Sequence, residues 1–329
     1  IIMPNRQFMR ILSWVIFFVY LGLFLQFIAT SSFSGILNAD VLASNYDDKV
    51  SKVGIDDNSV NIFGVLKNVF SSIVWLMFMY NWIKGEKKLT VALLFALISS
   101  LLFSLTQGSR GGIMRLFVDI PFIYFVFSGL LSKRKKKIFL MSIIGFVLFA
   151  LIGFWGLTIG RFGDKTSYSL LDIIVYYSSS NFLMFDNYAL DANGIRYGDR
   201  VFPLIRLLFG LDITGNYVNR RMVYSNMLLD DSQFSTFVGE FALDFGPIWG
   251  FVILLLFSTL LYQGVKHKYR FGFSNILILL LVFKIVIGGY SLFPYSEVGG
   301  NLGLLYVLFF YILFKYFERY GSRISSLGV

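Results

Sequence analysis

The sequence has no cysteine, a single histidine and few charged side chains. Without cysteine, disulfides and thiolate-ligated metals are excluded. The one histidine, His267, argues against a histidine-ligated metal centre, so we expect neither a metal nor another cofactor. Charged residues make up only 15% of the chain, whereas soluble domains carry about 25%. The chain therefore lacks the composition of a soluble protein.

Apolar residues dominate what is present. The chain is 57% hydrophobic and 19% aromatic, and its mean hydropathy is +0.71. This composition predicts an all-α, polytopic transmembrane helix bundle. The net charge of +10 would favour nucleic acid as a partner of a soluble protein. Here the cations form short clusters beside apolar runs, which indicates membrane topology and no nucleic-acid partner.

Runs of about 20 apolar residues predict eight membrane spans. Five lie within residues 1–160 and three within 237–329, and a large loop at 161–236 separates them. The chain opens Ile1-Ile2-Met3-Pro4, so we expect native residues, or whole helices, to precede it. The predicted spans are 10–30, 62–83, 89–106, 113–131, 138–159, 237–263, 273–293 and 301–317.

The cationic clusters predict the orientation of the spans. Clusters at 84–88, 133–137 and 266–270 fall at every second connection, and basic residues near both termini continue the alternation. The positive-inside rule then places both termini in the cytoplasm. The acidic loop 31–61, the turn 107–112, the large loop 161–236 and the loop 294–300 would lie outside.

The large loop has the composition of folded structure rather than of a linker. Residues 168–177 and 202–209 are apolar enough to form amphipathic helices that are interfacial or buried. Aromatic side chains recur between them. No internal repeat is visible in the chain, which weighs against an inverted-repeat transporter.

Arg110 stands in the short turn Gln107-Gly108-Ser109-Arg110-Gly111-Gly112, which precedes the fourth predicted span. In the predicted topology this helix presents its N-terminus outward, where free N–H groups favour an anion. Glycine permits close backbone approach, and the arginine fork suits phosphate. The alternative is a tight turn whose arginine extends to lipid headgroups.

Arg115 and Asp119 lie four residues apart on the same predicted helix, a spacing that suits an ion pair. Lys284, near the middle of the seventh span, is a second possible partner for Asp119. Charges within a span are costly unless they are paired. We therefore assign these residues to helix contacts rather than to a catalytic step.

Glu240 and Asp244 open the sixth span with the same four-residue spacing, so they share one helix face near the outer boundary. A partly desolvated carboxylate there has its pKa raised toward that of a general base. The alternative is that Glu240 pairs with a loop arginine. Asp244 precedes Phe-Gly-Pro at an expected kink and is assigned a structural role.

The large loop also carries several arginines and tyrosines. Any single loop arginine is most simply a solvated charge. As a set beside tyrosines and aspartates, these side chains fit recognition of a sugar phosphate. The predicted substrate-binding residues are Arg161, Arg196, Arg200, Arg206, Arg220, Arg221, Tyr217 and Tyr224.

The layout resembles the Wzy-type polymerases of O-antigen and other oligosaccharide repeat units. The resemblance covers roughly residues 89–265. It lies in the Gly-Ser-Arg-Gly-Gly turn before a span, the large arginine-bearing loop and the segment Gly239-Glu240-Phe241-Ala242-Leu243-Asp244-Phe245-Gly246. Members of that family have more spans than eight.

The resemblance implies a metal-independent membrane glycosyltransferase of the GT-C type. Its donor and acceptor would be polyprenyl-diphosphate-linked oligosaccharides outside the bacterial cytoplasmic membrane, and its accessory partners a flippase and a chain-length regulator. Arg110 with the loop arginines would stabilise the leaving diphosphate. Glu240 would activate the acceptor hydroxyl, so Arg110 and Glu240 are the expected catalytic residues.

Three alternatives stay open at the level of sequence. An O-antigen ligase is expected to use an outward-facing histidine, which this chain lacks in the predicted topology. A flippase or other transporter of lipid-linked oligosaccharides would also need internal cations. A membrane scaffold would use its arginines only for lipid contact.

Overall fold

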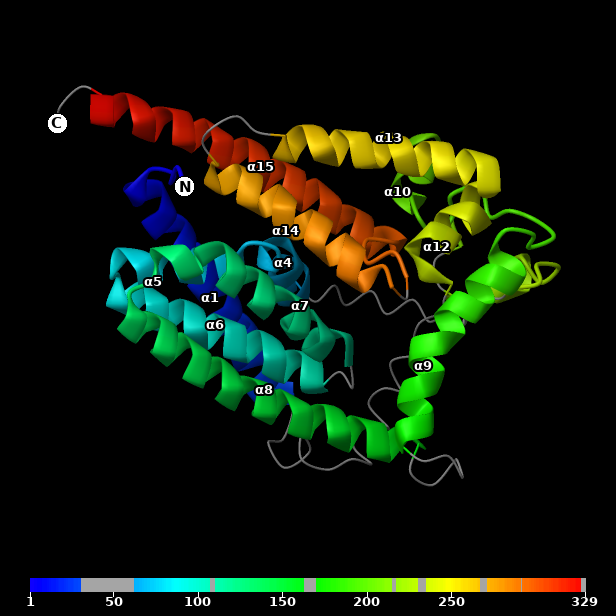
Figure 1. Ribbon diagram of the computed structural model, residues 1–329, viewed down its shortest axis with the longest axis horizontal. Coiled ribbons are helices and arrows are strands. Elements are labelled where there is room, and N and C mark those ends of the chain that lie inside the picture. The colour runs from blue at the N-terminus through cyan, green and yellow to red at the C-terminus, as the bar shows by residue number, and fades with distance from the viewer. Residues whose placement is uncertain are drawn as a thin grey trace. The chain divides into compact units, whose positions relative to one another are not determined.

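A computed structural model describes residues 1–30, 62–106, 110–162, 170–214, 217–229, 235–266, 271–290 and 292–326. These residues are helical and contain no β-sheet beyond one isolated bridge between Ile2 and Gly272, so the all-α prediction is confirmed. The chain forms two compact units (Figure 1). Unit 1 comprises residues 1–3 and 168–319, and unit 2 comprises residues 4–167 and 320–329. The predicted acidic loop 31–61 lies outside the described residues.

Unit 2 is a bundle in which α1 packs against α4, α5 and α6, and α7 packs against α5, α6 and α8. Phe95 of α6 contacts Phe17 and Phe24 of α1, with ring centroids 5.9 and 5.0 Å apart. Aromatic contacts of this kind hold the bundle by apolar burial. Its elements are α1 (Arg6–Thr30), α4 (Ile62–Phe70), α5 (Val74–Lys84), α6 (Lys87–Thr106), α7 (Arg110–Phe127), the 3₁₀ turn η1 (Ser128–Leu130) and α8 (Lys133–Phe162).

The second predicted span, 62–83, is two helices rather than one. A turn at 71–73 separates α4 from α5, and the Ser71 hydroxyl donates to the Asn68 carbonyl over 2.9 Å. Serine side chains compete for backbone groups in this way and weaken a helix interior. The apolar composition of 62–83 concealed this interruption.

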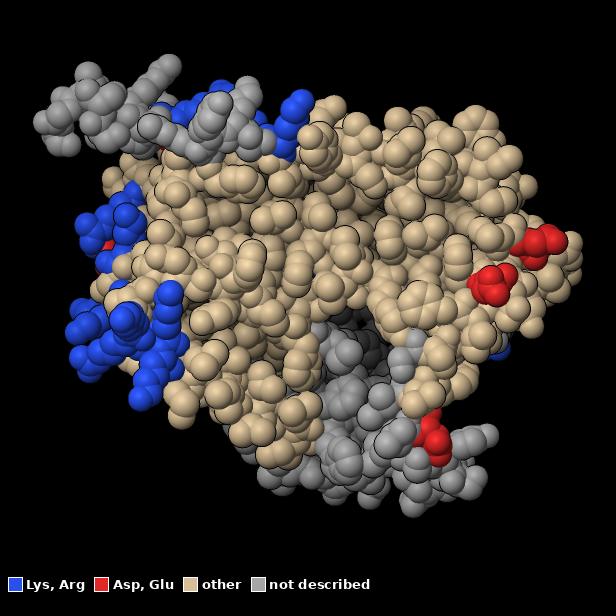
Figure 2. Space-filling view, in the orientation of Figure 1, with Lys and Arg blue, Asp and Glu red and all other residues tan. Residues whose placement is uncertain are grey.

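One end of unit 2 carries its cationic clusters. Arg6 and Arg10 at the start of α1 pair with Glu86, in the turn between α5 and α6, at 2.5 and 2.7 Å. Lys135 near the start of α8 donates to the Trp82 carbonyl near the end of α5 over 2.8 Å. On the face that Figure 2 shows, Lys and Arg side chains gather at one end, and the middle of that face has none drawn in blue. The clusters within this unit thus share one end, as the alternation predicted.

Unit 1 contains the large loop and the C-terminal helices. α12 packs against α13, α13 against α14, and the π-helical turn η2 against α9 and α12. The described residues between 170 and 229 form helices and turns. The elements are α9 (Leu170–Met184), η2 (Phe185–Ala189), α10 (Pro203–Leu208), α11 (Tyr217–Val223), α12 (Thr236–Phe245), α13 (Pro247–Val265), α14 (Phe273–Gly288) and α15 (Glu297–Ser326).

The predicted sixth span, 237–263, is also broken. Gly246 adopts φ +77°, which favours glycine, and Pro247 starts α13 in the first-turn position that proline prefers. α12 then packs closely on α13, because a Cβ at Gly250 would lie 2.5 Å from the Phe241 carbonyl oxygen. Asp244 and Glu240 therefore lie on a separate short helix rather than at the top of a continuous span.

Contacts between helix ends give unit 1 two distinct ends. At one end the Glu318 carboxylate, late in α15, accepts from the backbone N–H and the hydroxyl of Ser274 at the start of α14. At the other end the Phe237 N–H donates to the Gly289 carbonyl, next to the end of α14, over 2.8 Å. Glu297 and Pro247, which begin α15 and α13, belong to this second end.

Four described helices are long and apolar enough to cross a membrane, and they mark the chain as a membrane protein. Only 6% of the α13 segment is buried within the protein, as expected of a helix that faces lipid. The qualifying segments are Arg6–Ala29, Lys87–Ser104, Pro247–Val265 and Glu297–Arg319.

Candidate functional site

A turn from the large loop is anchored on the C-terminal end of α12. The Arg196 N–H donates to the Leu243 carbonyl over 3.0 Å. One oxygen of the Asp244 carboxylate accepts the backbone N–H groups of Arg200 and Val201 over 3.1 and 2.6 Å. Asp244 thus satisfies backbone donors that would otherwise be buried without partners.

Arg196 and Arg200 converge on Glu240. Arg196 contacts Asp244 through Nε at 2.7 Å and Glu240 through NH2 at 3.3 Å. The Nε of Arg200 lies 3.0 Å from the same Glu240 oxygen. Both arginines are buried, and Glu240 is 0% exposed. Two guanidinium groups therefore share one carboxylate outside water.

Arg220 forms a second pair, with Glu297 at the start of α15. Its NH1 lies 3.1 Å from Glu297 Oε2, and its NH2 contacts Oε1, so the pair is bidentate. Arg220 is only 2% exposed, whereas the Glu297 side chain is 42% exposed. NH1 of Arg220 also donates to the Thr214 carbonyl over 3.2 Å.

Arg206 binds backbone carbonyls instead of a carboxylate. Its Nε and NH2 donate to the Asp212 carbonyl over 3.1 and 2.7 Å. Its NH1 donates to the carbonyls of Arg196 and Tyr197 over 3.2 and 3.1 Å. A guanidinium group has five N–H donors, so most of those of Arg206 hold the loop together.

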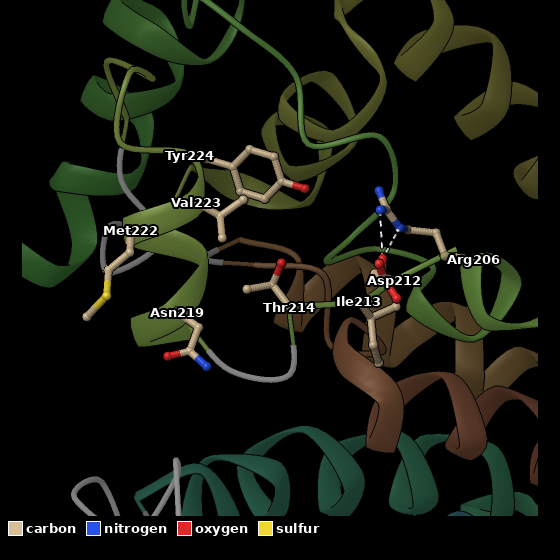
Figure 3. A pocket seen from close by; sticks show the side chains of 8 residues that line it. All are labelled: Arg206, Asp212, Ile213, Thr214, Asn219, Met222, Val223 and Tyr224. Atoms are coloured by element: carbon tan, nitrogen blue, oxygen red, sulfur yellow. Dashed lines mark hydrogen bonds between the residues drawn. The ribbon is translucent and has the colours of Figure 1, made fainter. Parts of the chain in front are cut away.

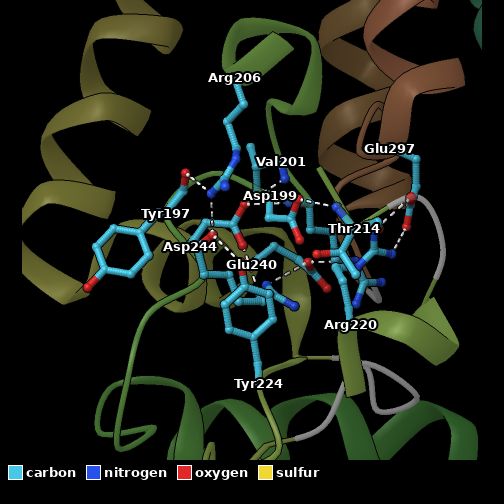
Figure 4. A network of polar contacts seen from close by, with 12 residues as sticks. Tyr197, Asp199, Val201, Arg206, Thr214, Arg220, Tyr224, Glu240, Asp244 and Glu297 are labelled. Atoms are coloured by element: carbon cyan, nitrogen blue, oxygen red, sulfur yellow. Dashed lines mark hydrogen bonds and ion pairs between the residues drawn. The ribbon is translucent and has the colours of Figure 1, made fainter. Parts of the chain in front are cut away.

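Together these side chains form what we call the charged cluster, at the end of unit 1 where α13 and α15 begin. Its four arginines and four carboxylates balance in formal charge. Asp199 joins the others because it accepts the Thr214 N–H over 2.9 Å. Figure 4 shows the connected side chains. The members are Arg196, Arg200, Arg206, Arg220, Asp199, Glu240, Asp244 and Glu297.

Unusual backbone conformations surround the charged cluster. Tyr197, Thr236 and Glu297 have φ values of +54°, +66° and +66°, which side chains other than glycine rarely adopt. A β-branched residue such as Thr236 is especially disfavoured there. Such residues persist only where the surrounding structure holds them, and they concentrate at functional sites.

A pocket of about 530 Å³ adjoins the charged cluster. Figure 3 shows Tyr224 on one side, Arg206 with Asp212 on the other, and Thr214 between them. The Tyr224 hydroxyl donates to the Arg196 carbonyl over 3.2 Å. Burial raises the pKa of the Tyr224 phenol, and the nearby Asp199 charge raises it further, so this phenol stays protonated at neutral pH.

Several predicted residues are not brought into the cluster by described contacts. Arg221 is exposed on α11. Asp119 is buried in unit 2 and Lys284 is in unit 1, so their pairing stays a prediction. For four further residues, the helix that carries them is described but the side chain lies outside the described residues: Arg110, Arg115, Arg161 and Tyr217.

Sequence reasoning missed Asp199 and Glu297. Asp199 stands between arginines in the loop, and Glu297 lies in the predicted outer loop 294–300. An acidic residue beside a set of buried arginines is a natural partner, so a search for charge balance along the outer loops would have selected both.

The fold and the charged cluster define a class, namely an all-helical membrane protein with a buried, charge-balanced arginine–carboxylate site at one end of unit 1. Comparison with protein-family models, curated proteins and solved structures gives no match.

Proposed function

We propose that this protein polymerises polyprenyl-diphosphate-linked oligosaccharide repeat units at the extracytoplasmic face of the bacterial cytoplasmic membrane. It would transfer the growing glycan from its lipid diphosphate to the non-reducing end of a new lipid-linked unit. The eight-span topology with cytoplasmic termini, and assistance from a flippase and a chain-length regulator, belong to this proposal.

The observation that carries the proposal is the buried charged cluster. Buried ion pairs are weak contributors to stability, and well-packed apolar residues of similar volume often do as well or better. Glu240 is 0% exposed, and Arg196 and Arg200 share it. A catalytic role therefore explains this buried cluster better than a contribution to folding alone. Its position, at the end of unit 1 away from Lys315 and Arg319, fits an outward-facing site.

The charge balance of the cluster gives the transfer step a simple electrostatic form. Glu240 would accept the proton of the acceptor hydroxyl as the new glycosidic bond forms. The bond between the donor sugar and its diphosphate breaks in the same step, and the leaving diphosphate takes the electron pair. One negative charge is lost at Glu240 while another develops on the leaving group.

Arg196 and Arg200 would respond to this exchange. When Glu240 becomes neutral, both guanidinium groups lose a negative charge that pairs with them. The negative charge of the diphosphate can replace it. Arg221 of the same unit is proposed to bind the second phosphate of the ground-state substrate. The roles assigned to Arg110 and Arg161 from the sequence stay predictions.

Reconstitution tests the proposal. The purified protein in liposomes receives lipid-linked repeat units, and the glycan products are separated by length. Wild type and the exposed-site control Asp191→Asn should give a ladder, whereas Glu240→Gln should give single units. If wild type gives no ladder but moves the lipid-linked units across the bilayer, the transporter alternative replaces the polymerase. Transfer of a preformed glycan to a lipid acceptor without elongation would favour the ligase.

A further inference from the structure

The pocket beside the charged cluster has the chemistry of a site for uncharged sugar rings. Its polar lining residues are Asp212, Thr214, Asn219 and Tyr224, and Ile213, Met222 and Val223 supply apolar surface. Hydroxyl and amide groups bind sugar hydroxyls, while apolar side chains cover the C–H face of a ring. Its volume of about 530 Å³ lies within the range of about 300–1,000 Å³ typical of ligand pockets.

Arg206 does not make this pocket an anion site. It is the one cation among the described lining residues, and four of its N–H contacts reach the carbonyls of Asp212, Arg196 and Tyr197. Binding a phosphate would break these contacts and release the loop. The Asp212 carboxylate in the same wall would also repel an anion.

The pocket is bonded directly to the charged cluster. The Thr214 N–H donates to Asp199, and its carbonyl accepts from Arg220. The Tyr224 hydroxyl donates to the carbonyl of Arg196, whose side chain contacts Glu240. A ring held in the pocket would therefore adjoin the proposed reacting groups.

We infer that the pocket binds an uncharged sugar unit of the oligosaccharide, separately from the diphosphate. The inference rests on the proposed function and deepens it, because it assigns sugar recognition to Asp212, Thr214 and Tyr224 and a loop-positioning role to Arg206.

Cysteine protection tests the pocket, since the chain has no native cysteine. Met222→Cys is labelled with an uncharged maleimide in nanodiscs, and Leu228→Cys, an exposed site outside the pocket lining, is the control. The probes are repeat-unit oligosaccharide released from its carrier by mild acid, and farnesyl diphosphate. The oligosaccharide should slow labelling at least fivefold at Met222→Cys only, and farnesyl diphosphate should not.

The outcomes distinguish the hypothesis that the pocket binds a sugar from the hypothesis that the protein polymerises repeat units. A ladder from wild type without oligosaccharide protection of Met222→Cys would overturn the pocket and leave polymerisation standing. Protection without a ladder would support the pocket and overturn polymerisation. Protection by farnesyl diphosphate alone would show an anion site and contradict the inference. Added to Met222→Cys, Asp212→Asn should abolish most of the protection, and Asp191→Asn should not.

A second, independent observation concerns α10. The ring of Phe202, just before α10, lies 6.3 Å from that of Phe257 and 6.2 Å from that of Phe293. Phe257 is ten residues beyond Pro247, the start of α13. At 1.5 Å per residue, it lies about 15 Å along that helix. Figure 1 shows α10 beside α13, in agreement with this contact.

The outer face of α10 is apolar. Leu208 and Phe209 are 85% and 78% exposed, and Ile205, Leu207 and Leu211 are also exposed. The Asn301 side chain fixes the entry to this segment because it donates to the Val201 carbonyl over 2.8 Å. We infer that residues 202–211 enter the membrane and that the lipid acyl chains cover this face. The depth of Phe257 along α13 favours lipid over a protein partner.

Depth-dependent quenching tests this placement without reference to activity. Leu208→Cys and Asp191→Cys are labelled with an environment-sensitive dye in liposomes. The dye at position 208 should be blue-shifted and quenched by lipids with a nitroxide in the acyl chain, and the dye at 191 should be quenched by iodide. Quenching of the dye at 208 by iodide alone would overturn the inference.

Discussion

Units 1 and 2 handle their polar groups in different ways. The described ion pairs of unit 2, from Arg6 and Arg10 to Glu86, lie at its exposed end. Examples of polar contacts between its helices are small, such as Asn81 with Ser13 at 2.8 Å and Lys67 with Ser104 at 3.3 Å. Unit 1 concentrates arginines and carboxylates in one connected cluster. It also contains all four described residues other than glycine with positive φ. Among the described residues, the buried arginine–carboxylate pairs and the strained backbone conformations therefore occur in unit 1.

The largest effect should follow the removal of Asp244. Asp244→Ala removes the carboxylate that lies 2.7 Å from the Nε of Arg196, and it removes the acceptor of two loop N–H groups. Breaking a buried pair costs about 3–5 kcal/mol, so the free energy of unfolding should fall by about that amount. Chemical denaturation in micelles measures it. The exposed control Asp191→Ala should change stability by less than about 0.5 kcal/mol, and a similar loss in both variants would contradict the account.

Replacement of Glu240 should lower the activity of the protein that remains folded. Glu240→Gln keeps the shape and the hydrogen-bond acceptor but cannot take a proton. General-base contributions are about 10²–10⁴-fold, so the initial rate of glycan elongation should fall at least about a hundredfold. The rate in liposomes is the measurement, with the same protein level in each sample. Elongation within about threefold of wild type would remove Glu240 from the mechanism.

Close packing of α12 on α13 gives an intermediate effect. In Gly250→Ala the new Cβ would lie 2.5 Å from the Phe241 carbonyl oxygen, so backbone must shift. Overpacking costs about 1–3 kcal/mol, and the melting temperature should fall. The matched variant in unit 2 is Gly145→Ala, where no described atom lies within 4 Å of the new Cβ. It should raise the melting temperature slightly because alanine favours helix; equal behaviour of the two variants would refute the close contact.

The smallest effect belongs to the exposed ion pairs of unit 2. Hydrogen bonds from Arg6 and Arg10 hold the pKa of Glu86 below its ordinary value of 4.5. Their stabilisation is thus complete above that pH and is lost as the pH falls through the lowered pKa. The melting temperatures of wild type and Glu86→Gln should differ slightly at neutral pH and converge in acid. A difference that grows in acid would have the wrong sign.

Composition and charge alternation sufficed to predict the helical fold and the shared cationic end of unit 2. The breaks between helices were predicted less well. The sixth span was predicted as continuous although Gly246-Pro247 marks its break, because a run of apolar residues outweighed the turn signal. The interruption at 71–73 has a still weaker signal, since it involves a hydrogen bond from the Ser71 hydroxyl.

The charged cluster was predictable only in part. The spacing of Glu240 and Asp244 placed them on one helix face, and the loop arginines were selected by type. Their pairing joins residues 40 to 77 positions apart, and no helical periodicity relates such positions. Arg196 and Arg200 meet at Glu240 through an irregular turn rather than the helix that their spacing would suit.

The most direct test of the central claim removes a charge pair without unbalancing the cluster. The double variant Glu240→Gln with Arg200→Gln keeps the Arg196–Asp244 pair and loses one charge of each sign. Its glycan products in liposomes are compared with those of wild type after both are shown to unfold at similar temperatures. We predict a stable protein that yields only single repeat units. A stable double variant that makes the wild-type ladder would show that the cluster serves folding alone.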